Sequence, residues 1–242
     1  MAEKIRLDTL IFQKGLVTSR SKSSALIMEG KVTVDGRIVT KPGFAASESS
    51  EILIKEPPEF VSRGGQKLKK ALEEFSIAVK DKICLDAGAS TGGFTDCLLQ
   101  NGAKKIYCVD VGCDILDSKL RNDLRVVNIE KTNIRYFDNN LLQDEIDLAV
   151  ADVSFISLEK VLPKLKELVK KGGGIVVLLK PQFEAPRGST KKGVVTDEKV
   201  RRQTIEKIKK FSEMLGLKLT AETPSPIKGP KGNMEHFLYF RN

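Results

Sequence analysis

Two lysines and two carboxylates in this sequence could together remove a proton from a hydroxyl group: Lys67, Asp152, Lys180 and Glu235. A hydroxyl is a poor nucleophile, so a base has to take its proton as it attacks an electrophile. A lysine can be that base only if desolvation and a neighbouring cation lower its pKa. We expect Lys67 to be the cation beside Lys180, whereas Asp152 and Glu235 would orient the lysines and oppose the fall in pKa. Lys180 is then either the base or the group that holds the hydroxyl in line for attack.

The positions of these residues along the predicted strands favour one shared site. Asp152 and Lys180 each follow directly on a short apolar run, and Pro181 ends the second strand because it cannot donate a ladder hydrogen bond. Ligands of doubly wound sheets bind at the carboxyl ends of the parallel strands. The last strand runs the opposite way, so Glu235 at its start would reach the same edge, and Lys67 would join from a helix. Each charge alone is more simply a strand exit that faces water, but the four together indicate a site.

The stretch CLDAGASTGGFTD links a predicted strand to a helix through a glycine-rich loop. Glycines there let the backbone approach a ligand at the helix N-terminus. The loop lacks the GxGxxG of dinucleotide enzymes and the GK[ST] of P-loops, and its acid, Asp86, suits a ligand with an amino group. Asp110, which ends the next strand, can bind both ribose hydroxyls of a nucleoside. A purely structural turn is the alternative to this cofactor site.

Strand, D-x-G-x-x-x-G loop, helix, strand and acid in this order resemble the S-adenosylmethionine (SAM) site of class I methyltransferases. The resemblance implies SAM as the cofactor, with its adenine near Asn133, which follows the third strand. The predicted cofactor-binding residues are Asp86, Gly88, Ser90, Thr91, Gly92, Gly93, Phe94, Asp110 and Asn133. We predict no metal site, because the four cysteines lack CxxC spacing, and we expect all four to be small buried side chains.

Beyond about residue 62, short apolar runs alternate with amphipathic helical segments. This alternation is typical of a doubly wound, mostly parallel α/β sheet. The resemblance makes it the Rossmann-like fold of class I SAM-dependent methyltransferases, with seven strands of which the last is antiparallel. The run 175–179 predicts a strand buried on both faces, preceded by a turn at glycines 172–174. We therefore expect a methyltransferase domain over residues 61–242.

The N-terminal 60 residues predict a separate, small α+β domain and its linker. A helix at 6–14 is followed by a second helix capped by Thr18 or Ser19, Asp35-Gly36 indicates a hairpin, and a last strand ends in the double proline 57–58. The RLD opening, the SR before the second helix and the GKVTVDGRIVTKP hairpin resemble the S4 RNA-binding domain. The resemblance implies that four basic residues contact RNA phosphates, which position a protein without reading sequence: Arg6, Arg20, Lys22 and Lys31.

The chain has 242 residues with 41 Lys and Arg against 32 Asp and Glu, a net charge of +9. This excess favours a polyanionic partner, nucleic acid first and an anionic membrane second. Arg63, Arg187 and Lys191, in or beside glycine-rich loops, are further candidates for RNA contact, although solvated side chains are equally expected there. No apolar stretch approaches the roughly 18 residues of a transmembrane helix, and the start shows no signal peptide. We expect a cytoplasmic protein without membrane contact, and no feature predicts a protein partner.

Over nearly its whole length the sequence resembles the TlyA family, often labelled hemolysin A. The matching segments are VSRGGQKL, DAGASTGGFTD, DVSFISL, LLKPQFEAPRG and GNMEHFLYF. The order Lys67, Asp152, Lys180, Glu235 resembles the tetrad of RNA ribose 2′-O-methyltransferases. The resemblance implies SAM-dependent methylation of a cytidine ribose 2′-hydroxyl in ribosomal RNA (rRNA), in 23S rRNA for a chain of this length and also in 16S rRNA for longer members.

Two observations bear on the other functions that such a chain could have. DVSF lacks the aromatic-proline motif, such as NPPY, that base methyltransferases more often carry, which counts against methylation of a base. An inactive RNA-binding module that senses SAM is the first alternative, and the four charged residues argue against it. A membrane-acting hemolysin, as the family label suggests, is the second.

Overall fold

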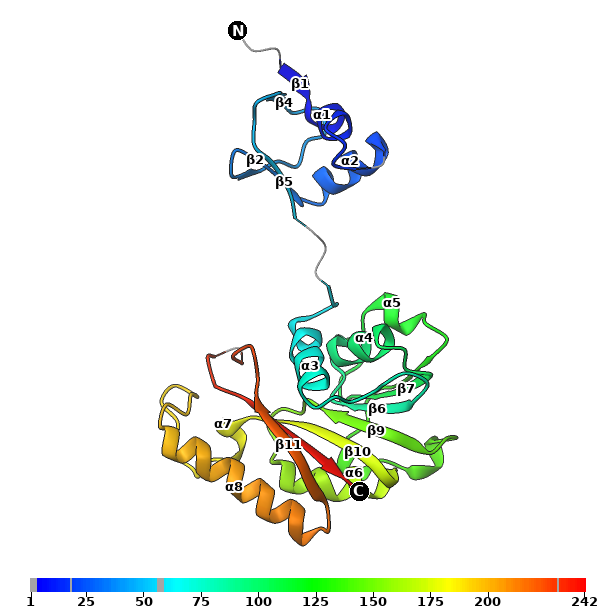
Figure 1. The fold of residues 1–242 in the computed structure, drawn as a ribbon, viewed down its shortest axis with the longest axis vertical. Coiled ribbons are helices and arrows are strands. Elements are labelled where there is room, and N and C mark those ends of the chain that lie inside the picture. The colour runs from blue at the N-terminus through cyan, green and yellow to red at the C-terminus, as the bar shows by residue number, and fades with distance from the viewer. Residues whose placement is uncertain (1–3, 18, 56–58, 230) are drawn as a thin grey trace. The chain divides into compact units, whose positions relative to one another are not determined.

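The computed structural model describes residues 4–17, 19–55, 59–229 and 231–242 (Figure 1). Contacts divide the chain into two compact units, Met1–Pro58 and Glu59–Asn242, each of which is described by itself. The predicted cap Thr18 and the double proline 57–58 lie outside the described residues. The boundary that we predicted after residue 60 falls inside the second unit, because Phe60 packs in the core of that unit.

The N-terminal unit combines two helices with two small antiparallel sheets. Ser19 caps the second helix by accepting a hydrogen bond from the backbone N–H of Lys22, and the hairpin turns at Asp35 and Gly36, both with positive φ. The sequence prediction missed the pairing of β1 with β4, since both strands are only three residues long and far apart in the chain. The elements are β1 (Lys4–Arg6), α1 (Leu7–Gln13), α2 (Arg20–Met28), β2 (Val32–Val34), β3 (Arg37–Ile38), β4 (Ala45–Ser47) and β5 (Ile52–Ile54).

The C-terminal unit is built on a seven-stranded sheet with the order β11-β12-β10-β9-β6-β7-β8. Only β12 runs antiparallel to its neighbours, β10 and β11, which confirms the predicted topology. The strands are β6 (Ile83–Ala87), β7 (Lys105–Val109), β8 (Val126–Ile129), β9 (Ile146–Ala151), β10 (Val169–Leu179), β11 (Lys218–Pro224) and β12 (His236–Arg241).

Helices cover both faces of this sheet (Figure 1). One face of the sheet is covered by α3 (Arg63–Glu74), α4 (Gly93–Gln100) and α5 (Ser118–Arg121), which form one hydrophobic core with the strand side chains on that face. The opposite face is covered by α6 (Leu162–Leu168) and α8 (Glu198–Met214), which form a second core with the remaining strand side chains. The short α7 (Pro181–Glu184) follows β10 directly, and the single-turn helices are η1 (Ile134–Tyr136), η2 (Asn139–Leu141) and η3 (Leu158–Lys160). Because both faces of the central strands are covered, their sequences are mostly apolar, and the run 175–179 of β10 is wholly so.

Two local predictions were wrong. Glycines 172–174 lie within β10, where its pairing with β9 shifts register, and do not form a turn that precedes the strand. Gly173 is required there because a Cβ would lie 2.9 Å from the Lys170 carbonyl oxygen. Cys113 is exposed, whereas the other three cysteines are buried as expected. Among the described residues, no helix has the length and apolar character needed to cross a bilayer.

Candidate active site

The four predicted catalytic residues form two lysine–carboxylate ion pairs. Lys67 Nζ lies 2.5 Å from Glu235 Oε2, and the two side chains are 9% and 1% exposed. Lys180 Nζ lies 2.6 Å from Asp152 Oδ1, with side chains 10% and 23% exposed. Lys180 Nζ also donates a hydrogen bond of 2.8 Å to Ser154 Oγ. The first pair is sealed inside the protein, and the second opens towards solvent on its carboxylate side.

Strand register brings these residues to one edge of the sheet. Leu179 of β10 pairs with His236 of β12, so the next residues outward, Lys180 and Glu235, are neighbours at that edge. Val177 of β10 pairs with Ala151 of β9, so Asp152 leaves the sheet beside them. Alternation along the strands gives all three side chains the face on which α3 packs.

Lys67 reaches this edge from the buried side of α3, whose apolar stripe of Leu68, Ala71 and Leu72 packs on the sheet. The sequence predicted that Lys67 would stand beside Lys180 as a cation. In the structure each lysine has a carboxylate at ion-pair distance, so the edge is close to electrically neutral. Glu235 Oε1 is buried without a hydrogen-bond partner, and any side chain at Gly229 would collide with it.

A cleft of about 1010 Å³ opens at the same strand ends. Four predicted cofactor residues line it: Gly88, Ser90, Asp110 and Asn133. Asp110 is half-buried, and its two oxygens accept backbone hydrogen bonds from Ser90 (2.8 Å) and Gly112 (2.7 Å). Gly88 has φ +82°, and a Cβ there would lie 3.0 Å from the Asp152 carbonyl oxygen. The loop after β6 can therefore lie against the end of β9 and bring the cleft to the Lys180–Asp152 pair.

The other predicted cofactor residues are not among those that line the cleft. Phe94 is 2% exposed and packs near Phe237, with ring centroids 6.1 Å apart. Gly92 and Gly93 have no room for a side chain because other parts of the protein pack against them. A Cβ at Gly92 would collide with Leu120, and a Cβ at Gly93 would collide with Ser62. Thr91 is exposed on the loop. The glycines in this half of the loop thus serve the packing of α3, α4 and α5.

Asp86 lies beneath the loop, fully buried in β6. Thr95 Oγ1 donates a 2.7 Å hydrogen bond to Asp86 Oδ2, whereas Oδ1 has no hydrogen-bond partner. Burial raises the pKa of Asp86 to about 7, and the charge of Asp152 also raises it. An unpaired, buried acceptor beneath this cleft is compatible with a ligand that carries an amino group, so these residues fit the predicted cofactor.

An aromatic pair at the cleft was missed by the sequence prediction. Phe155 is 91% exposed, with φ +61° in the left-handed region that non-glycine residues rarely adopt. Its ring lies 5.1 Å from that of Phe183, and both residues line the cleft. An exposed ring held by an unfavourable backbone conformation is a common feature of functional sites. In the sequence Phe155 is a single aromatic residue after DVS, three residues beyond the predicted strand end at Asp152.

A buried carboxylate joins the two loops that carry these rings. Glu184 of α7 accepts hydrogen bonds from Ser157 Oγ (2.6 Å) and from the backbone N–H of Leu158 (2.7 Å). Burial raises the pKa of Glu184. Glu184 therefore ties the segment after β9, which holds Asp152 and Phe155, to the segment after β10.

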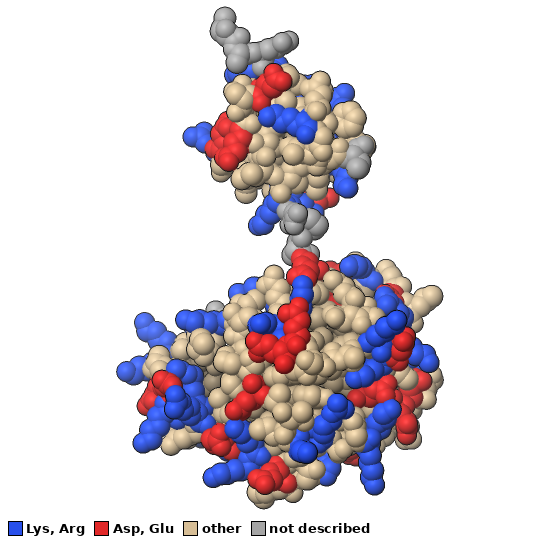
Figure 2. Space-filling view, in the orientation of Figure 1, with Lys and Arg blue, Asp and Glu red and all other residues tan. Residues whose placement is uncertain are grey.

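The predicted RNA-contacting residues are distributed over both units, among the mixed charges of the surface (Figure 2). Arg187 lines the cleft, and Arg63, Lys191 and Lys22 are exposed. Lys31 lies 2.6 Å from Glu29, so part of its charge is compensated. The remaining two, Arg6 and Arg20, share one acidic partner, Asp8.

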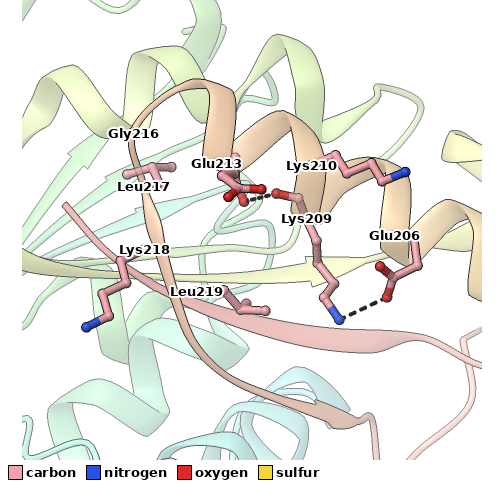
Figure 3. Close-up of a pocket in the computed structure, with 9 residues that line it drawn as sticks. Glu206, Lys209, Lys210, Glu213, Gly216, Leu217, Lys218 and Leu219 are labelled. Carbon is pink, nitrogen blue, oxygen red and sulfur yellow. Dashed lines mark hydrogen bonds and ion pairs between the residues drawn. The ribbon is translucent and has the colours of Figure 1, made fainter.

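A second hollow, of about 630 Å³, lies between α8 and β11 (Figure 3). Lys209 on its wall lies 2.9 Å from Glu206 and 3.2 Å from Glu222. Lys166 donates a hydrogen bond to the Leu215 carbonyl beside it. None of the tetrad residues lines this hollow, and its buried polar residue, Ser212, already donates its hydroxyl to the Lys209 carbonyl.

Comparison with known proteins identifies the family. Residues 60–242 match the FtsJ-like methyltransferase family, and residues 5–52 match the S4 domain. The chain belongs to the FtsJ-like methyltransferase family, with an S4 domain at its N-terminal side. Membership of this family confirms the predicted methyltransferase fold and S-adenosylmethionine as the cofactor.

Several relatives match along almost the whole chain. The 16S/23S rRNA (cytidine-2′-O)-methyltransferase TlyA of Mycobacterium tuberculosis is 43% identical over 244 residues, which is 100% of this chain and 91% of that protein. Hemolysin A of Brachyspira hyodysenteriae is 44% identical over 239 residues, which is 98% and 99% of the two chains. A solved structure from Streptococcus thermophilus, named as a hemolysin, superposes with a TM-score of 0.76 at 39% identity and covers 100% of this chain and 90% of that one. These matches confirm the predicted TlyA and hemolysin A relationship, while the role of each site residue stays a prediction.

Proposed function

We propose that this FtsJ-like methyltransferase transfers the methyl group of SAM to the 2′-hydroxyl of a cytidine ribose in ribosomal RNA. The observation that carries the proposal is the Lys180–Asp152 pair, which is joined to the wall of the cofactor cleft through Asp152 and Ser154. The relative from Mycobacterium tuberculosis bears the name of this reaction on 16S and 23S rRNA, and one from Campylobacter jejuni bears it on 23S rRNA. Either substrate would place the enzyme in the cytoplasm.

SAM supplies an electrophilic methyl group at a sulfonium centre, and the residues of the chain have to prepare the hydroxyl. Lys180 Nζ, fixed by Asp152 and Ser154, is the group that we place next to the 2′-oxygen. As an ammonium it would hold the oxygen in line by donating a hydrogen bond, and as a neutral amine it would accept the proton. Positioning alone contributes several kcal/mol to such transfers, so both roles depend on the same geometry.

The Lys67–Glu235 pair would stabilise the part of the sheet edge that holds Lys180. Its side chains are almost completely buried and join α3 to the start of β12, next to the end of β10. A pair this far from solvent holds its geometry without competition from water. We assign it the role of fixing the sheet edge on which Lys180 lies.

Phe155 and Arg187 are the candidates for holding the target nucleotide at the cleft. The exposed ring of Phe155, tilted against that of Phe183, offers a π-face to a base that has left its helix. Arg187 lines the same cleft and could bind an adjoining phosphate. Stacking and phosphate contact do not distinguish one base from another, so the choice of cytidine would rest on where the S4 domain positions the enzyme on the RNA.

The test is methyl transfer from labelled SAM to ribosomal subunits, followed by identification of the modified nucleoside. Wild-type protein should give 2′-O-methylcytidine. Lys180→Met should lower the rate at least about 100-fold, as for loss of a general acid or base, and leave the SAM dissociation constant unchanged. Lys170→Met is the matched control, because Lys170 forms a Lys–Asp pair of 2.6 Å with Asp147 at the other end of β10; its rate should stay near wild type.

Three results would contradict the proposal. Bound SAM without methyl transfer to any rRNA would favour the inactive RNA-binding module. A methyl group on the base would exclude the 2′-hydroxyl. Lysis of liposomes by pure protein that does not methylate rRNA would favour the membrane-acting alternative.

A further inference from the structure

Two arginines of the S4 domain converge on a single carboxylate. Arg6 donates from Nε to Asp8 Oδ1 (3.1 Å) and from Nη2 to Oδ2 (3.0 Å). Arg20, at the start of α2, donates from Nε (3.1 Å) and Nη2 (3.0 Å) to the same Oδ2. The two side chains come from different elements and have only Asp8 as their common partner among the described hydrogen bonds.

Burial is sharply unequal within this group. The Asp8 side chain is 3% exposed, whereas those of Arg6 and Arg20 are 57% and 54% exposed. The backbone of Asp8 is held in place, because its N–H donates a hydrogen bond to the Pro42 carbonyl (3.1 Å). Arg6 rests against Gly43, where a Cβ would lie 3.1 Å from Nη1. The carboxylate is thus an anchor, and the guanidinium groups are the parts that solvent or a ligand can reach.

The anchor stays charged at every physiological pH. Hydrogen bonds from Arg6, together with the hydrogen bonds and charge of Arg20, lower the pKa of Asp8 to about 2. Two guanidinium charges against one carboxylate leave the group with a net charge of +1. Each guanidinium has five N–H donors and uses two of them on Asp8, so three per arginine remain for a phosphate.

We infer that Asp8 is a positioning residue that holds Arg6 and Arg20 together as one preformed binding site for RNA phosphates. The inference rests on the proposed RNA-binding role of the S4 domain. A free arginine side chain loses rotamer entropy when it binds, and a side chain that is already fixed avoids that cost. Planar guanidinium forks suit bidentate contact with phosphate. Asp8 therefore strengthens binding to a polyanion although its own charge opposes it.

This inference and a simple charge count predict opposite effects for one substitution. Asp8→Asn removes a negative charge, so charge alone predicts tighter RNA binding. It also turns an N–H₂ group towards the guanidinium donors, so the arginines separate, and we expect roughly 3- to 10-fold weaker binding. The slope of log K against log salt concentration should fall by about 1, as for the loss of one phosphate contact. Glu48→Gln is the control, because it makes the same charge change at an exposed residue of the turn after β4; it should bind as tightly as wild type or slightly tighter.

The measurement is the dissociation constant of the full chain for a 23S rRNA fragment at several salt concentrations, with circular dichroism to show that each variant folds. Arg20→Lys keeps the positive charge but loses the planar guanidinium group, so it should also weaken RNA binding. If Asp8→Asn does not fold, the RNA affinity of Arg20→Lys tests the inference in its place. Unchanged or tighter binding by folded Asp8→Asn, or wild-type binding by Arg20→Lys, would overturn the inference. If Arg6→Ala and Arg20→Ala both bind RNA like wild type, the proposed RNA role of these arginines fails instead.

Discussion

The buried Lys67–Glu235 pair allows catalysis and stability to be separated by substitution. Lys67→Met removes the cation and leaves the Glu235 carboxylate 1% exposed, with one oxygen already lacking a hydrogen-bond partner. Removing one partner of a buried pair costs about 3–5 kcal/mol, because an uncompensated charge remains inside the protein. Lys180→Met should cost only about 1 kcal/mol, since Asp152 is 23% exposed and can be hydrated. Both variants should lose methyl transfer, but only the first should lose much stability.

The assay is urea unfolding at pH 8, followed by fluorescence of the tyrosines or by circular dichroism. The double variant Lys67→Met/Glu235→Leu should recover most of the lost stability, because apolar side chains of similar volume commonly replace a buried ion pair at little cost. A loss below about 1 kcal/mol at pH 8, or a double variant as unstable as the single one, would refute the picture of a sealed pair.

Three further predictions concern the cleft and the loop beneath it. Phe155→Ala should raise the KM for RNA by roughly 10-fold or more, as for loss of one stacked base, without changing SAM affinity; equal losses for both ligands in binding assays would contradict this. For Asp86, a folded-state pKa of about 7 against 3.8 means that the folded state binds more protons than the unfolded state between these values, so stability should fall as pH rises from about 4 to 7. Asp86→Asn should lack this fall in the free energy of unfolding, and identical pH profiles would contradict the assignment. Gly92→Ala should cost about 1–3 kcal/mol by overpacking against Leu120, and clearly more than Gly188→Ala, which has a similar positive φ but nothing within 4 Å of the new Cβ.

The sequence allowed the sheet and its functional edge to be predicted because both follow from simple patterns. Apolar runs define the strands, and residues that directly follow parallel strands must meet at one edge, as Asp152 and Lys180 do. The pairing within the tetrad could not be predicted, since the distance from α3 to β12 depends on packing. Lys67 therefore turned out to lie against Glu235.

The glycine loop shows where spacing alone misleads. Its pattern indicates that the backbone comes close to something, but it does not distinguish a ligand from a neighbouring helix, and Gly92 and Gly93 are close to side chains and backbone of the protein itself. Asp86 could have been placed by alternation, because Leu85 and Ala87 belong to one core and Cys84 to the other. Phe155 could not be predicted as a site residue, because its place at the cleft depends on a positive φ and on a partner ring, Phe183, that lies beyond the next strand.

The place of β12 in the sheet has a consequence for how the protein matures. This strand is made after all the others, yet it lies between β10 and β11 and pairs with both. While the chain is being synthesised, β10 and β11 cannot complete their hydrogen bonding, and Glu235 is not yet present to meet Lys67. The Lys67–Glu235 pair therefore forms only when β12 has entered the sheet between β10 and β11, so this edge of the sheet is completed by the strand that comes last in its sequence order.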